Sequence, residues 1–130
     1  MKPLLFFAPH YVGSLRYFEK LLPHLTERYE VRFLILFVKY DTCDEMLDYC
    51  RQRGLAYDFI APPPLSNNSQ TPRFPVLSLV RNLICYRKQI IRLLADKNIK
   101  KIIVVNDSGS YSGYLMAKAN ERGIDTAVLQ

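Results

Sequence analysis

The 130-residue sequence contains no tryptophan, and it has only five glycines and three cysteines. Cys43, Cys50 and Cys85 are an odd number without CxxC spacing, which argues against a disulfide framework or a zinc knuckle and favours a reducing compartment. The glycines form neither the GxGxxG spacing of a dinucleotide-binding loop nor a Walker phosphate loop. We therefore predict no metal site and no cofactor held by these 130 residues.

Long apolar runs and dense basic runs are also missing. The opening apolar run extends only from Pro3 to Pro9, and no small-residue cleavage site follows it, so it does not match a secretory signal. No stretch reaches the roughly 18–20 apolar residues that cross a bilayer. The net charge is +6, yet the basic residues are scattered, which disfavours nucleic acid and leaves an anionic membrane surface as a partner to consider. We expect a cytoplasmic protein, either soluble or peripheral at the inner membrane face.

What the sequence does contain is a fivefold alternation of strand and helix patterns. Apolar runs rich in branched and aromatic residues predict strands at 3–8, 31–38, 56–60, 102–105 and 126–129. Helical patterns lie between them, and the short connections imply right-handed crossovers. The sequence thus predicts an α/β fold. We expect one Rossmann-like, three-layer α/β/α domain over 1–130, with a mostly parallel five-stranded sheet in the order 3-2-1-4-5.

Local signals predict where the first two helices begin and end. Ser14 is expected to cap the first helix, and Pro23 is expected to kink or break it. Thr42 and Glu45 match a capping box at the start of the second helix. Gly54 matches a left-handed cap at the end of that helix.

A Pro-rich segment at 61–75 predicts an exposed loop before a long helix over 76–96. Arg81, Lys88 and Arg92 fall on one stripe of this helix, because seven and eleven residues are nearly whole numbers of turns. The stripe suits contact with anionic lipid headgroups, and the alternative interpretation is an ordinary solvated face opposite the core. The apolar residues expected on the core side are Leu79, Val80, Leu83, Ile84, Ile90, Ile91 and Leu94.

The predicted strand order places the reversal of winding between the first and fourth strands, where ligands of such sheets bind. In the loop after the first strand, Gly13 permits close approach of a ligand or a left-handed backbone, and Ser14 starts a helix whose free amides favour anions or hydroxyls. His10 is the only histidine in a strand-end loop. It could serve as a general base if a carboxylate orients its ring; the alternative is a histidine bonded to the backbone.

The loop after the fourth strand is rich in hydroxyl groups. Its polar side chains and the following helix start can hydrogen-bond a polyhydroxylated or phosphorylated ligand, while Asp107 and a serine also cap the helix. A serine-hydrolase elbow is excluded because tyrosine stands at 111, where the motif needs serine. The predicted binding residues of this loop are Asp107, Ser108, Gly109, Ser110, Tyr111 and Ser112.

Two stretches, KPLLFFAPHYVGSLRYFEKLLPHLTERYEVRFL and KKIIVVNDSGSYSGYLMAKANERGIDTAVLQ, resemble segments of the GT-B glycosyltransferases. The first shows a buried strand, a Pro/Gly loop, a helix and a second strand, and the other shows a strand, a polar turn, a helix and a final strand. The resemblance implies an acceptor-side domain, forming the amino-terminal half of a longer two-domain protein. In some members a catalytic histidine follows the first strand, and His10 matches that position.

The resemblance also implies the partners of this domain. A carboxyl-terminal domain of the same chain would bind a nucleotide-sugar donor, and the acceptor would be a sugar, a lipid-linked molecule or another hydroxyl compound. The amino-terminal domain alone would then have little transferase activity. Two alternatives stay open, namely a non-catalytic flavodoxin-like or nucleotide-binding module, and half of a nucleotide-sugar epimerase.

Overall fold

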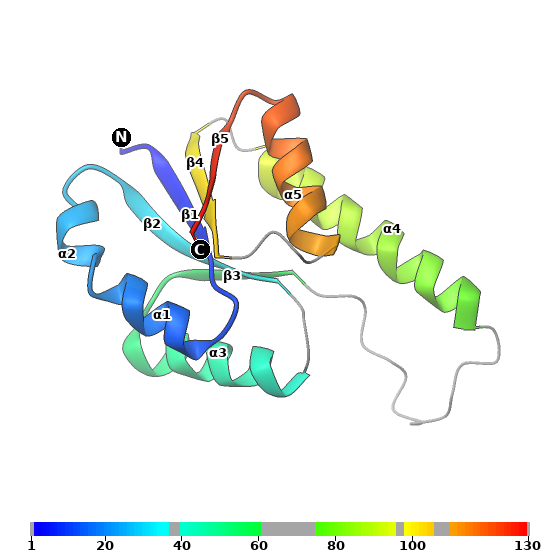
Figure 1. The fold of residues 1–130 in the computed structure, drawn as a ribbon, viewed down its shortest axis with the longest axis horizontal. Coiled ribbons are helices and arrows are strands. Elements are labelled where there is room, and N and C mark those ends of the chain that lie inside the picture. The colour runs from blue at the N-terminus through cyan, green and yellow to red at the C-terminus, as the bar shows by residue number, and fades with distance from the viewer. Residues whose placement is uncertain (1, 37–39, 61–74, 96–97, 106–109, 130) are drawn as a thin grey trace.

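The computed structural model describes residues 2–36, 40–60, 75–95, 98–105 and 110–129, which form a sheet flanked by helices (Figure 1). All its strand pairs are parallel, in the order β3-β2-β1-β4-β5. The predicted α/β fold and strand order are confirmed. The strands are β1 (Leu4–Ala8), β2 (Glu30–Leu36), β3 (Tyr57–Ile60), β4 (Ile99–Val104) and β5 (Asp125–Val128), and the helices are α1 (Val12–Glu19), α2 (Leu22–Leu25), α3 (Tyr40–Arg53), α4 (Pro75–Leu94) and α5 (Ser110–Glu121).

The central strand β1 is covered on both faces, and all five of its residues are buried. Because alternate side chains of a strand point to opposite faces, Leu4, Phe6 and Ala8 belong to the core under α4 and α5. Leu5 and Phe7 belong to the core under α1 and α3. Figure 1 shows these helix pairs on opposite sides of the sheet. Burial on both faces explains why the sequence of β1 is apolar without alternation.

Three phenylalanines join α1 to the sheet. The rings of Phe7 in β1 and Phe18 in α1 stack in parallel with centroids 3.8 Å apart. Phe33 in β2 meets both rings edge-on, with centroids at 6.0 Å from each. All three side chains are at most 2% exposed. This cluster fixes α1, and with it the turn that leaves β1.

Two of the predicted helix ends are confirmed. α1 ends at Glu19 and a separate short helix starts at Leu22, so the predicted break occurs. Pro23 lies in the first turn of that short helix, where a missing N–H leaves no hydrogen bond unmade. Gly54 follows α3 with a φ of 66°, the left-handed conformation expected of a glycine cap.

The predicted cap at Ser14 is wrong. α1 already begins at Val12, and its N-cap residue is Tyr11, which makes no side-chain capping bond. Ser14 is buried inside the helix at 8% exposure. Val12 and Leu15 pack against the core below this turn. Packing of an apolar face therefore sets the helix start, outweighing a cap that is typically worth about 1 kcal/mol.

The predicted capping box at Thr42 and Glu45 is also wrong. α3 begins at Tyr40, so both residues are already helical, and Glu45 is exposed. Cys43 and Met46, on the same first turns, are buried against the sheet. Because these two side chains are buried, the helix begins before Thr42, the residue at which the capping box would start it.

α4 follows the predicted apolar side only in part. Ile90 and Leu94 are buried as expected, together with Tyr86. Four residues predicted for the core are instead 41–49% exposed, namely Val80, Leu83, Ile84 and Ile91. The side chain of Leu79 and the segment 61–74 lie outside the described residues, so only Pro75 of the predicted loop is placed, and it begins α4.

The length of α4 explains the exposed residues of its first turns, whereas Ile91 in the last turn is on a side of the helix that does not pack against the sheet. Twenty residues of α-helix extend about 30 Å, whereas strands of four to six residues extend only about 13–20 Å. A crossover helix runs back along the sheet, so its first turns start at the edge where the strands end. Figure 1 shows the N-terminal turns of α4 reaching beyond α5 and the sheet. In the parts of the chain that are described, no helix meets the length and hydropathy needed to cross a bilayer.

The three cysteines form no disulfide within the described residues. Cys43 and Cys50 are both buried under α3, and the Cys43 thiol lies 3.7 Å from the Leu36 carbonyl oxygen, to which it donates. Burial raises the pKa of the Cys50 thiol from its ordinary value of 9.0 to about 11, and the charge of Glu19 acts in the same direction. Cys50 is therefore a neutral core residue at physiological pH.

We predict that Phe18→Ala lowers the free energy of unfolding by about 3–5 kcal/mol, because it removes the ring stacked on Phe7 and leaves a cavity. Tyr17, its neighbour on α1, is 65% exposed. Tyr17→Ala is the matched control and should change stability by no more than about 0.5 kcal/mol. Urea unfolding followed by circular dichroism measures both. Equal losses in the two variants would contradict the proposed role of the aromatic cluster.

A second prediction concerns alkaline pH. Because the pKa of Cys50 is higher in the folded state, its stabilising contribution is complete below pH 9.0 and is lost as the pH rises to about 11. The loss should reach about 2–3 kcal/mol. The difference in unfolding free energy between parent and Cys50→Ala should therefore change across that interval and stay constant below it. Denaturant titrations at a series of pH values test this, and a constant difference at all pH values would refute it.

Candidate functional site

The loops that follow β1 and β4 leave the sheet side by side. Ala8 at the end of β1 pairs in register with Val104 at the end of β4. The N–H of Val105 then donates to the Ala8 carbonyl at 3.3 Å. The winding reverses between these two strands, and open α/β sheets bind ligands at the carboxyl ends of the strands at such a reversal.

The loop after β1 presents two accessible rings. Pro9 is buried, whereas His10 and Tyr11 are exposed, Tyr11 by 56%. Their ring centroids lie 6.3 Å apart and their planes are perpendicular. Among the described residues, no hydrogen bond or ion pair holds the His10 imidazole, whether from a carboxylate or from the backbone. The imidazole is therefore accessible to a ligand at the end of β1.

Of the two possibilities predicted for Gly13, close approach of a ligand and a left-handed backbone, the structure excludes the second. The positive-φ residues of the described chain are Gly54 and Gly123, so a left-handed backbone at Gly13 is excluded. Instead, a Cβ placed on Gly13 would collide with the ring of Tyr11. Glycine at this position lets the Tyr11 ring fold back over the first turn of α1. The residue thus shapes the surface beside His10 through a side-chain contact.

The loop after β4 is described only where α5 begins. Asp107, Ser108 and Gly109 lie outside the described residues, as do the side chains of Ser110 and Tyr111. Ser112 in α5 is buried at 8% exposure, as is Ser14 in α1. Of the predicted contacts whose side chains are described, His10 is thus the accessible one, and Tyr11 is an accessible neighbour that sequence reasoning did not select.

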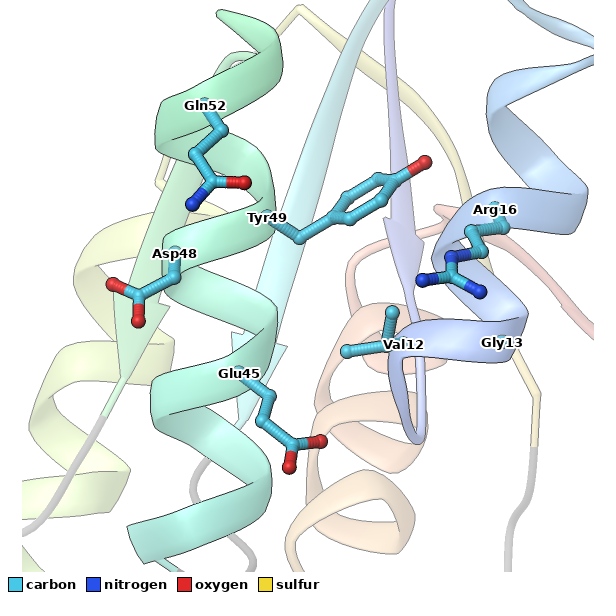
Figure 2. Close-up of a pocket in the computed structure, with 7 residues that line it drawn as sticks. All are labelled: Val12, Gly13, Arg16, Glu45, Asp48, Tyr49 and Gln52. Atoms are coloured by element: carbon cyan, nitrogen blue, oxygen red, sulfur yellow. The ribbon is translucent and has the colours of Figure 1, made fainter.

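A cleft between α1 and α3 was not anticipated from the sequence. Its volume is about 450 Å³, and it opens beside the first turn of α1 (Figure 2). Its walls are side chains at helical spacing on two different helices. Such spacing shows which residues share one face of a helix, but it does not show which two helices face each other. The lining residues are Val12, Gly13, Arg16, Glu45, Asp48, Tyr49 and Gln52.

Tyr49 organises the charges around this cleft. Its hydroxyl donates to Glu19 Oε1 at 2.9 Å, and Arg53 Nη1 lies 3.7 Å from the same oxygen. The guanidinium carbons of Arg16 and Arg53 lie 5.8 and 5.2 Å from the Tyr49 ring centre. Burial raises the pKa of Tyr49, and the bond to Glu19 raises it further. Tyr49 is therefore a neutral phenol fixed between two cations.

The cleft offers charges of both signs. In Figure 2 the Arg16 side chain extends from α1 toward Tyr49, while Asp48 points away from α1. Asp48 has its own partner, with its Oδ1 3.5 Å from Arg51 Nη1. This arrangement suits hydrogen bonds to a hydroxyl-rich ligand. Across the described ranges, no group of three His, Cys, Asp or Glu residues is placed to hold a metal ion.

Arg81, Lys88 and Arg92 lie on another part of the molecule. All three are exposed on α4, on the opposite side of the sheet from the cleft. None of the ion pairs found in the described part of the chain includes them. The structure therefore places the basic stripe on a different surface from His10.

No protein-family model matches this chain, and no curated protein matches it significantly. The function of the molecule must be inferred from its fold and from the groups at the carboxyl ends of β1 and β4.

We predict that Gly13→Ala displaces the Tyr11 ring and alters the environment of His10. The stability cost should be small, since Tyr11 is exposed and can rotate away. Gly113→Ala is the matched control, because this glycine is also helical and a Cβ there meets nothing within 4 Å. The His10 and Tyr11 ring resonances should shift in the first variant only, which NMR spectra of the two proteins would show. Unchanged resonances in Gly13→Ala would contradict the contact.

Proposed function

We propose that this chain is the acceptor-binding domain of a sugar-nucleotide-dependent glycosyltransferase of the GT-B type. The observation that carries the proposal is the exposed imidazole of His10, at the end of the central strand and at the winding reversal of the sheet. An accessible imidazole at that position can act as a general base if a substrate hydroxyl lies within hydrogen-bond reach. The resemblance of the two strand–loop–helix stretches to GT-B segments supports the same conclusion.

In the proposed reaction, the acceptor hydroxyl lies within hydrogen-bond reach of the His10 imidazole. The hydroxyl oxygen forms a bond to the anomeric carbon of the donor sugar, and His10 accepts the hydroxyl proton. The bond between the anomeric carbon and the donor phosphate breaks, and the nucleotide leaves with that electron pair. A carboxyl-terminal domain would hold the donor, while the loops after β1 and β4 would position the acceptor.

The surroundings of His10 fit an acceptor with a sugar-like surface. The exposed Tyr11 ring, held over Gly13, offers an apolar face against which the C–H groups of a sugar can pack. In this proposal the predicted contacts from Asp107 to Tyr111 would supply hydrogen bonds to the acceptor hydroxyls, whereas Ser112 is buried in α5. Since Asp107 belongs to the loop that follows the neighbouring strand, it is also the carboxylate we propose to orient the imidazole.

His10→Ala in the full-length protein should lower kcat by about 10²–10⁴-fold, the usual contribution of a general base. Binding of the nucleotide-sugar donor should stay nearly unchanged, because the donor would contact the other domain. His24→Ala is the control, since His24 is also exposed but lies on α2, away from the β1 and β4 edge. Initial-rate kinetics and donor titration calorimetry measure the two effects.

Two results would overturn the proposal. Unchanged kcat in His10→Ala would remove His10 from the mechanism. Tight binding of a free nucleotide or flavin by residues 1–130, weakened by His10→Ala, would instead favour a nucleotide-binding or flavodoxin-like module.

A further inference from the structure

The solvent side of α4 carries an apolar stripe. Leu77 is 64% exposed, Ile84 47% and Ile91 41%, and these three residues repeat every seven positions. Val80, 49% exposed, lies between them on the same side. A different side of the helix packs against the sheet, because Tyr86, Ile90 and Leu94 are buried in the core. α4 is thus apolar on two sides, only one of which packs against the sheet.

Cations border this apolar stripe along both of its edges. At 100° per residue, Arg81, Lys88 and Arg92 fall along one edge, and all three are exposed. Arg87 lies along the other edge, with its guanidinium carbon 5.1 Å from the Tyr114 ring centre. The sequence contains no Asp or Glu between Asp58 and Asp96. The exposed face of α4 is therefore apolar in the middle, basic at its borders and free of carboxylates of its own.

We propose that this face of α4 docks on an anionic membrane surface. Interfacial helices bury their apolar stripe at the boundary of headgroups and acyl chains, while Lys and Arg beside it reach the phosphates. The spacing of Leu77, Val80, Ile84 and Ile91 matches such a stripe.

Charge favours a lipid surface over a second copy of this chain. Two α4 helices packed along their apolar stripes would bring Arg81, Lys88 and Arg92 close to their own equivalents without a carboxylate of α4 to offset them. Like charges across such a seam disfavour association, whereas each cation near anionic headgroups strengthens binding about fivefold. The proposal does not depend on sugar transfer, and its test measures membrane binding alone.

The first experiment measures flotation of the full chain with vesicles of phosphatidylcholine, with and without a minority of phosphatidylglycerol. We expect binding to the anionic vesicles only. The combined change Arg81→Gln, Lys88→Gln and Arg92→Gln should weaken it on the order of 100-fold. The control Lys20→Gln, Arg28→Gln and Lys100→Gln removes the same charge from exposed positions on other elements and should retain most of the binding.

The second experiment uses the absence of tryptophan from the sequence. Ile84→Trp places a single indole in the apolar stripe, and Tyr17→Trp places one on α1, an exposed site on the opposite side of the sheet. With anionic vesicles, the emission of Ile84→Trp should shift to the blue and resist aqueous quenchers. The emission of Tyr17→Trp should not change.

Three outcomes would overturn the proposal. One is that the parent chain fails to bind anionic vesicles while circular dichroism shows it folded. Another is that the α4 triple variant and the charge-matched control lose the same affinity, which would mean binding by net charge alone. A third is that the chain does not bind vesicles but self-associates with increasing concentration, as measured by sedimentation, and that Ile84→Gln abolishes this self-association. That result would assign this face to a protein interface.

Discussion

The burial of β1 on both faces is the constraint on which the rest of this structure depends. Its five residues are all apolar and all buried, which requires helices on each side of the sheet. The stacked rings of Phe7 and Phe18 then hold α1 against one face. Because α1 is fixed in this way, the short turn from Ala8 to Val12 has little freedom. His10 and Tyr11 are consequently held at the carboxyl end of β1 by the packed helix α1.

The two helical layers differ in how completely they bury their apolar residues. α1 and α3 enclose the stacked aromatic cluster and the thiols of Cys43 and Cys50. α4 exceeds the strands in length, so its first turns extend past the surface that could cover them. One layer therefore supports the turn that carries His10, and the other exposes an apolar and basic face. The proposed acceptor site and the proposed membrane contact arise from these two layers separately.

Sequence signals succeeded where one local cause dominates. Gly54 adopts a left-handed conformation after α3, and the first helix is interrupted before Pro23. Both follow from the backbone conformations that glycine and proline allow, which depend little on the surrounding structure. Ser14 and Thr42 failed as caps because core packing extends both helices beyond them. The cleft around Tyr49 depends on which helices face each other, which a local pattern does not encode.

The sequence by itself determined the strands, their order and the position of the winding reversal, because apolar periodicity and crossover handedness leave few other solutions. Only the tertiary structure decided which apolar residues of α4 are covered, because that depends on the length of the helix relative to the strands and on which side of it packs against the sheet. It also decided that Gly13 accommodates the Tyr11 ring and not a left-handed turn. These are contacts between elements, and they are fixed only when the helices pack on the sheet.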